Sequence, residues 1–402
     1  MNELNFEIHW PRDTANFEYL GDIHSKMITV KHTGDIPTEF YLLSLSFMEA
    51  ANKLISHVLH ARENRKKDFW FFSIVYLYRQ GLELMIKSIA FKYIKLDASR
   101  KNFISRVRHN LKDSFFEVNA LVKEDSYQLT EEQFLWLSAF LSNISYIDEQ
   151  SDMFRYPFNQ KMEIFFSSQT HVNLRALGTN MINAFNILES LRNKQDIHCD
   201  LTCDPSLLIE GGSYNEQSVI GWNFYHRNYN FYPYIEGYME SADYICKLIM
   251  ETDDNGHLFL PMCYMYRNAI ELALKRILIE DCRYEQSIAF KKIKRKKHSV
   301  LGIWNLIRED IMLYSNAPDD DKTIEIVEIY INQLHNLDQT SDKFRYPIDT
   351  SLNLHFMNSK KFDVENISTC FNELFSFLDA VHSMLSSYKD IQSELTWEGD
   401  YY

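Results

Sequence analysis

Hydrophobic side chains recur along most of this chain at the three- to four-residue spacing that forms one face of an α-helix. Residues 36–61 and 232–250 have this spacing, whereas residues 69–94 and 258–279 are apolar on nearly every side. A helix that is apolar all round is typically buried at the centre of a bundle. The pattern therefore predicts an all-α fold with two buried central helices.

Capping and breaking residues mark the ends of the predicted elements. Thr130 precedes Gln133 at the spacing of a capping box, which predicts a helix start. Pro157 and Pro347 keep the segments before them from continuing as helix, because proline removes a backbone donor. We expect about five helices in each half of the chain. The further predicted helices cover residues 129–147, 174–193, 323–337 and 364–385.

Blocks of sequence are repeated between the two halves. Residues 76–89 (YLYRQGLELMIKSI) recur at 264–277 (YMYRNAIELALKRI), 188 positions later. Residues 148–158 (DEQSDMFRYPF) recur at 338–348 (DQTSDKFRYPI), 190 positions later, with seven of eleven residues identical. Blocks in one order at a nearly constant offset indicate an internal duplication. The chain is therefore predicted to contain two copies of one helical domain.

The duplication defines the expected domain organisation. Residues 1–35 alternate between aromatic or apolar and polar side chains, which predicts an N-terminal arm or small hairpin; the alternation runs through Phe6, Ile8 and Trp10 and then Met27, Thr29 and Lys31. A Gly-Gly-Ser turn marks the connector between the repeats, and an acidic tail that we expect to be frayed ends the chain. The predicted bounds are 1–35 for the arm, 36–195 for the first repeat, 196–227 for the connector, 228–390 for the second repeat and 391–402 for the tail.

Composition narrows the class of protein. The 402 residues include only 11 Gly and 8 Pro, too few for a turn-rich all-β fold. A net charge of −14 disfavours a protein that coats nucleic acid along its whole surface. The six cysteines follow no signal peptide, so we expect free, mostly buried thiols and a cytoplasmic location. The sequence contains no membrane-spanning run and no metal or cofactor motif, so we expect no membrane, metal or cofactor.

Each central helix carries three ionisable residues spaced four positions apart, on one helix face. These are Arg79, Glu83 and Lys87 in the first repeat and Arg267, Glu271 and Lys275 in the second. Such charges are costly on a buried helix unless they are paired. The repeats supply the same types of candidate partner. These are His109, Asp148, Asp152, Arg155 and Tyr156 in the first repeat and His298, Asp338, Asp342, Arg345 and Tyr346 in the second.

Two interpretations of these clusters are open. In the structural one, Arg155 and Arg345 pair with the helix glutamates, and Asp148 or Asp338 caps a turn. In the functional one, the clusters bind phosphate and perform acid–base chemistry. The catalytic residues would then be His109, His298, Glu83 and Glu271. The phosphate ligands would be Arg79, Arg267, Arg155, Arg345, Lys87 and Lys275. The supporting residues would be Asp148, Asp338, Asp152, Asp342, Tyr156 and Tyr346, the tyrosines either packing or stacking on a base.

A basic segment, expected to be a loop, precedes each histidine. Residues 99–109 (SRKNFISRVRH) and 291–298 (KKIKRKKH) have this composition. Such segments commonly bind nucleic acid or another polyanion, and a solvated charged surface is the alternative. The candidate nucleic-acid contacts are Arg106, Arg108, Lys294, Arg295, Lys296 and Lys297.

The combined motifs resemble those of all-α HEPN-like proteins of bacteria and their phages. They are Tyr-Arg-x-x-x-Glu-Leu-x-x-Lys, then His-x-hydrophobic, then Asp-x-x-Ser-Asp-x-Phe-Arg-Tyr-Pro, and the resemblance covers residues 36–193 and 228–387. It implies helical bundles paired about a two-fold axis, here a pseudo-two-fold axis between two repeats. Many such proteins are ribonucleases, with an arginine four to six residues before a histidine. Arg192 and His198 have that spacing, but the second repeat has no counterpart.

The resemblance implies an RNA- or nucleotide-binding protein in phage defence or a toxin–antitoxin system, with endoribonuclease activity left open. The alternative is a non-catalytic protein-interaction module, such as an adaptor, inhibitor or immunity component, whose charged clusters are structural. The expected partners are accordingly RNA or a nucleotide, or another protein, and a homodimer is compatible with either function.

Overall fold

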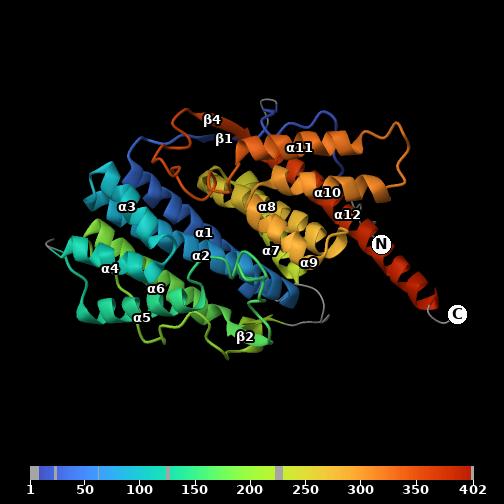
Figure 1. Ribbon diagram of the computed structural model, residues 1–402. Helices are drawn as coiled ribbons and strands as arrows, with labels where there is room; N and C mark the ends of the chain where they lie inside the picture. Colours follow the sequence, from blue (N-terminus) through green and yellow to red (C-terminus); the bar gives the residue numbers. More distant parts are fainter. Residues whose placement is uncertain (1–8, 22–24, 62, 124–126, 222–229, 400–402) are drawn as a thin grey trace. The chain divides into compact units, whose positions relative to one another are not determined.

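The computed structural model describes residues 9–21, 25–61, 63–123, 127–221 and 230–399 (Figure 1). Helices dominate these ranges, which confirms the predicted all-α class. The chain divides into two compact units. The large unit consists of Thr29–Met265 and Asp342–Lys360, and the small unit of Met1–Ile28, Tyr266–Ser341 and Lys361–Tyr402.

The large unit is built around one buried helix. Its helices are α1 (Ile36–Ala61), α2 (Asn64–Tyr93), α3 (Asp97–Val107), α4 (Leu111–Val122), α5 (Glu131–Ile147), α6 (Leu174–Asn193) and α7 (Phe231–Glu251), with 3₁₀ turns at Tyr214–Glu216 and Asp253–Leu258. Every residue of α2 from Phe69 to Phe91 is buried, because α1, α4, α6 and α7 pack against it. Figure 1 shows α1 and α2 side by side. The predicted central helix is therefore the core of this unit.

One close helix contact depends on a glycine. A Cβ at Gly237 of α7 would lie 2.1 Å from the carbonyl oxygen of Phe69 in α2, so a larger residue would push the two helices apart. Glycine allows this approach at some cost in helix propensity.

The predicted connector contributes a strand to the large unit. β2 (Thr170–Asn173) pairs antiparallel with β3 (Gln217–Ile220), with Thr170 opposite Ile220. Gly211 and Gly212 have φ angles of 100° and 89°, as the Gly-Gly-Ser turn requires. The end of the connector, residues 222–229, lies outside the described residues.

The small unit is a second set of helices. They are α9 (Gln286–Lys296), α10 (Val300–Tyr314), α11 (Thr323–Leu337) and α12 (Val364–Gly399), with a π-helical turn at Ile277–Asp281. α10 packs against α9, α11 and α12. The boundary between the units falls within α8 (Phe259–Arg276). The remaining secondary-structure elements are the strands β1 (Met27–Val30) and β4 (Lys360–Asp363).

Of the predicted N-terminal arm or hairpin, the structure describes residues 9–21 and 25–35, and Met27–Val30 form the strand β1. Residues 9–21 contain no strand. Phe17 is 1% exposed, and its ring contacts those of Tyr330 and Phe371 in the small unit. Phe6 and Ile8, on which the hairpin prediction partly rested, lie outside the described residues.

Three predictions of secondary structure need correction. Among the described residues, each repeat has six α-helices rather than about five, because the two expected basic loops are the helices α3 and α9. Their sparse apolar residues, Phe103 and Val107 in α3 and Ala289 and Ile293 in α9, lie four positions apart and are buried. The expected frayed tail is also helical as far as Gly399. By contrast, α1, α6 and α11 have the predicted bounds, and the Thr130–Gln133 capping box is present.

Local backbone geometry recurs between the repeats. Three non-glycine residues with left-handed φ angles in the first repeat have a counterpart 189 or 190 positions later. The pairs are Arg108 (47°) and Lys297 (54°), Ser151 (62°) and Ser341 (64°), and Met162 (69°) and Leu352 (70°). Non-glycine residues seldom adopt this conformation, so its recurrence supports the inferred duplication.

The compact units do not coincide with the repeats. α7 and Asp342–Lys360 come from the second repeat in sequence but belong to the large unit. The Tyr234 and Tyr238 hydroxyls of α7 donate to the carbonyls of Met153 and Phe154, at 2.9 and 3.0 Å. Segments of the two repeats therefore share one core.

No disulfide joins the six cysteines, all of which lie within the described residues; four are buried, and Cys199 and Cys203 are half-buried. Within the described ranges, no helix combines the length and apolarity required to cross a membrane.

Candidate acid–base site

α2 buries three charged side chains on one face. Arg79, Glu83 and Lys87 expose only 1%, 2% and 5% of their side chains. The Glu83 carboxylate accepts from Arg79 Nη1 at 3.2 Å and from Lys87 Nζ at 2.5 Å. The four-residue spacing brings these groups together along the helix. Glu83 is thus held between two cations.

Arg79 connects α2 to two loops. Its Nε lies 3.1 Å from Asp148 Oδ2, and Nη2 donates to the carbonyls of His109 (2.7 Å) and Asp148 (3.1 Å). The guanidinium is therefore used within the protein, and Arg79 does not line the cavity described below. The geometry gives Arg79 a structural position instead of the expected contact with phosphate.

His109 returns to α2 from the end of α3. Arg108, which ends that helix, has a φ of 47°, and this left-handed turn redirects the chain. His109 Nδ1 lies 3.1 and 3.2 Å from the two Glu83 oxygens, and 34% of its side chain is exposed. An ionised carboxylate only accepts hydrogen bonds, so Nδ1 carries the proton and Nε2 is left as the base. Within the described part of the chain, Nε2 has no hydrogen-bond partner.

The charge state of Glu83 follows from its neighbours. Burial alone would raise the pKa of Glu83, but Lys87, His109 and Arg79 together outweigh burial and hold it well below its usual range. Glu83 is therefore ionised at neutral pH. Arg79 and Lys87 balance the charges of Glu83 and Asp148, so a proton on His109 gives the group a net charge of +1.

Tyr346 adds a hydroxyl to this group from the segment Asp342–Lys360. The hydroxyl donates to Glu83 Oε1 at 2.8 Å and lies 3.4 Å from His109 Nδ1. Lys87 Nζ lies 4.7 Å from the centroid of the Tyr346 ring. Burial and the charge of Glu83 raise the pKa of Tyr346 well above its usual range, which keeps the hydroxyl protonated and able to donate.

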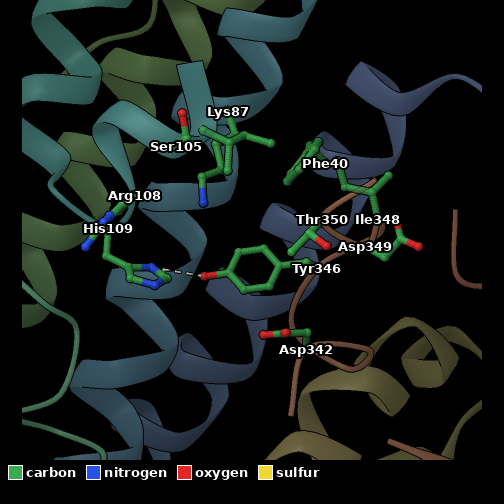
Figure 2. Close-up of a pocket in the computed structure, with 11 residues that line it drawn as sticks. Phe40, Lys87, Ser105, Arg108, His109, Asp342, Tyr346, Ile348, Asp349 and Thr350 are labelled. Atoms are coloured by element: carbon green, nitrogen blue, oxygen red, sulfur yellow. Dashed lines mark hydrogen bonds between the residues drawn. The ribbon is translucent and has the colours of Figure 1, made fainter. Parts of the chain in front are cut away.

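A cavity of about 320 Å³ in the large unit opens beside these residues (Figure 2). Its wall combines a basic part, an apolar part and two acidic side chains. The lining residues are Phe40, Lys87, Ile104, Ser105, Arg108, His109, Asp342, Tyr346, Ile348, Asp349 and Thr350. Figure 2 shows the Tyr346 ring extending across this space towards His109, with Lys87 above it. A cavity of this size can hold a small organic group such as one nucleotide unit.

The small unit contains an equivalent buried group. Glu271 accepts from Arg267 Nη1 at 2.8 Å and from Lys275 Nζ at 2.6 Å, and His298 Nδ1 lies 2.9 Å away. His298 also exposes 34% of its side chain. Burial opposes ionisation of Glu271, but Lys275, His298 and Arg267 lower its pKa well below the usual range. We call these four residues the Glu271 cluster, and Arg79, Glu83, Lys87 and His109 the Glu83 cluster.

The arginines of the Phe-Arg-Tyr-Pro motifs have positions that were not expected. Arg155 Nη2 donates to the Tyr156 hydroxyl at 2.8 Å, with no ion pair to Glu83. Arg345 pairs with Asp342 at 2.9 Å and approaches the Tyr76 hydroxyl at 3.4 Å. Both arginines are 3% exposed and neither lines the cavity, so the geometry supports neither a contact with phosphate nor the predicted pairing of Arg155 with Glu83.

Asp148 caps a turn, as the structural interpretation predicted. Its Oδ1 accepts from the backbone N–H groups of Asp152 and Met153, at 2.8 and 3.1 Å. Asp338 is equally buried, with 1% exposed. The first aspartate of the motif therefore has a local structural role in the first repeat.

The two basic segments differ in how their charges are used. Arg106 is paired with Glu117 (Nε–Oε1 2.6 Å), whereas Arg108 is exposed and lines the cavity. Four basic side chains at the end of α9 and just after it are exposed, and none of the four has an ion pair within the described residues. They are Lys294, Arg295, Lys296 and Lys297.

Arg192 has the spacing to His198 that the family's ribonucleases use, but the two residues do not form a site. The Arg192 guanidinium lies 3.7 Å from the centroid of Tyr41 and donates from Nε to Ser88 Oγ at 2.9 Å. His198 is exposed, and the described residues show no contact between it and Arg192. Those residues also contain no group of three or more His, Cys, Asp or Glu that could hold a metal ion.

Comparisons with known proteins found no matching family model, no matching curated protein and no matching solved structure. The chemical class of the site is therefore defined by its geometry alone. It is a histidine–carboxylate pair with one free ring nitrogen beside a cavity.

Proposed function

We propose that this protein binds RNA and cleaves it at the cavity beside the Glu83 cluster, as an HEPN-like ribonuclease. The observation that carries the proposal is the Glu83–His109 pair. An ionised, buried carboxylate holds Nδ1, and the partly exposed ring lines a cavity with Nε2 available as a base. The sequence resemblance to a family rich in ribonucleases agrees with this chemistry, and we extend it to a role in phage defence or a toxin–antitoxin system.

The proposed reaction uses the base of His109 and needs no metal ion. Nε2 takes the proton of a ribose 2′-hydroxyl, and the 2′-oxygen attacks the adjacent phosphorus. The bond to the 5′-oxygen breaks, and that oxygen takes a proton from water. The products are a 2′,3′-cyclic phosphate and a 5′-hydroxyl, after which His109 returns its proton to solvent. Arg108 at the rim and the protonated His109 provide positive charge for the phosphate.

Cleavage of labelled single-stranded RNA by the full-length protein tests the proposal. We expect His109→Ala to lower the rate by about 10²–10⁴-fold, the usual contribution of general acid–base catalysis. His257→Ala is a matched control, because His257 also pairs with a carboxylate (Nε2–Glu49 Oε2 2.7 Å) but does not line the cavity. Its rate should be unchanged. Thermal unfolding of each variant shows whether the fold is retained.

A second candidate is a non-catalytic interaction module. It is favoured by the way the buried charges satisfy one another within the protein and by their recurrence in the Glu271 cluster. Intact RNA with wild-type protein, together with unfolding of the His109→Ala variant, would support this candidate instead.

A further inference from the structure

The segment Asp342–Lys360 reaches the Glu83 cluster from far along the chain. It belongs to the large unit, although its sequence is part of the second repeat. Tyr346 and Glu83 are 263 positions apart, and their side chains are joined by a 2.8 Å hydrogen bond. The cluster of the first repeat therefore includes a hydroxyl from the second.

Contacts on both sides hold this segment in place. Gln80 Nε2 of α2 donates to the carbonyl of Arg345, directly before Tyr346, at 3.0 Å. Further along, the backbone N–H of His32 donates to the carbonyl of Phe356 at 2.9 Å, and the two rings are 5.4 Å apart. Anchoring before and after Tyr346 fixes where its ring enters the cavity.

The hydroxyl has a chemical consequence for the pair beside it. Glu83 Oε1 accepts from Tyr346, and it is also the nearer oxygen to His109 Nδ1. Each donor to a carboxylate weakens its interaction with the others, because they share the same negative charge. Tyr346 thus adjusts how strongly Glu83 holds the Nδ1 proton and, through it, the basicity of Nε2.

We infer that Tyr346 is the positioning residue of the Glu83–His109 pair, so that the site of the first repeat is completed by the second. The inference deepens the proposed function. It concerns a residue that lines the cavity and acts on His109 through Glu83. Lys87, stacked over the ring, supports the orientation of the phenol.

The first test is a spectroscopic signature that needs no RNA. A histidine N–H bonded to a carboxylate gives a far-downfield proton resonance, and in the full-length protein we expect one from His109 that disappears in Glu83→Gln. Tyr346→Phe should move it further downfield, because Glu83 loses a competing donor. Tyr41→Phe, which also removes a tyrosine–carboxylate hydrogen bond (Tyr41–Glu189 Oε1, 2.6 Å), should leave it unchanged. An unmoved resonance in Tyr346→Phe would overturn the inference.

The second test varies the acidity of the phenol at position 346 while keeping its aromatic ring. Fluorotyrosines of increasing acidity at position 346 donate more strongly to Glu83, and we expect a graded fall in kcat with KM nearly constant. By the same argument Tyr346→Phe, which removes the donor, should raise kcat by up to about tenfold, the effect of one hydrogen bond to a charged group. A flat series would show a packing role only. If the resonance responds but wild-type protein leaves RNA intact, the proposed function fails while the positioning role stands.

Discussion

The Glu83 cluster and the Glu271 cluster have the same internal chemistry and different surroundings. In each, a buried glutamate accepts from an arginine and a lysine on its own helix and holds a histidine that is 34% exposed. Around them the charge differs. α3 carries an arginine neutralised by Glu117, whereas α9 presents a run of exposed, unpaired cations within the described residues.

This contrast separates two kinds of constraint. A buried charge cannot change without leaving its partners unpaired, so the clusters remain alike. Surface cations carry no such penalty and can diverge. The two clusters therefore stabilise the fold and hold the histidine–glutamate pairs. The exposed cations of α9 are the better candidates for attracting a polyanion.

The largest effect should come from removing the central carboxylate of either cluster. Glu83→Ala and Glu271→Ala each remove the carboxylate that a buried arginine and a buried lysine share, and we expect each to lower the free energy of unfolding by about 3–5 kcal/mol. Urea unfolding measures this. Glu117→Ala, which removes only the surface pair with Arg106, should lower the free energy of unfolding far less. A large cost at Glu83 together with a small one at Glu271 would show that the clusters are not equivalent.

A smaller effect should distinguish the two basic helices. Replacing Lys294, Arg295, Lys296 and Lys297 with Gln should weaken RNA binding and reduce the slope of log K against log salt by up to about 3, at roughly 0.7 per released phosphate contact. Replacing Lys101, Arg106 and Arg108 should change the slope less, because Arg106 is already paired. Equal changes would remove the distinction between α3 and α9.

Acid should destabilise the protein through both clusters. The folded pKa values of Glu83 and Glu271 lie well below the unfolded value, so their contribution is complete above about pH 4.5 and is lost as the pH falls further. The free energy of unfolding of wild-type protein should therefore decline steeply below that pH. In Glu83→Gln the decline should be shallower. Unchanged steepness would mean that Glu83 titrates normally in the folded protein.

The smallest expected effect is at Asp68, whose contribution to stability changes with pH in the opposite direction. Asp68 accepts from the backbone N–H of Val219 at 2.7 Å, and burial raises its pKa to about 6. A raised carboxyl pKa gives a contribution present below about pH 4 and lost as the pH rises through 6. Asp68→Asn should therefore become slightly more stable relative to wild type between pH 4 and 7. A relative loss over that range would place the Asp68 pKa below its unfolded value.

Local patterns predicted much of the fold. Continuous amphipathic periodicity located α1, α6 and α11 to the residue, and the Thr130–Gln133 pair located the start of α5. α3 and α9 were missed because dense basic residues obscured a two-residue apolar stripe. The two apolar side chains of each helix form a buried face only because other parts of the same unit pack over them, and this packing overrides the weak local helix signal.

The site was only partly predictable for a related reason. The four-residue spacing identified Arg79, Glu83 and Lys87, and the duplication added His109. The partners of Arg155 and Arg345, and the entry of Tyr346, depend on packing between segments up to 269 positions apart. The apolar wall with Phe40 and Ile348 carried no local signal.

The proposed function is tested most directly by measuring whether a bound oligonucleotide contacts His109. Histidine-labelled full-length protein is titrated with an oligonucleotide whose 2′-hydroxyls are replaced by hydrogen, so that it binds without being cleaved. We expect a saturable shift of the His109 ring resonances, with those of His257 unchanged. Saturated binding of this oligonucleotide that leaves the His109 resonances in place would contradict the proposed function.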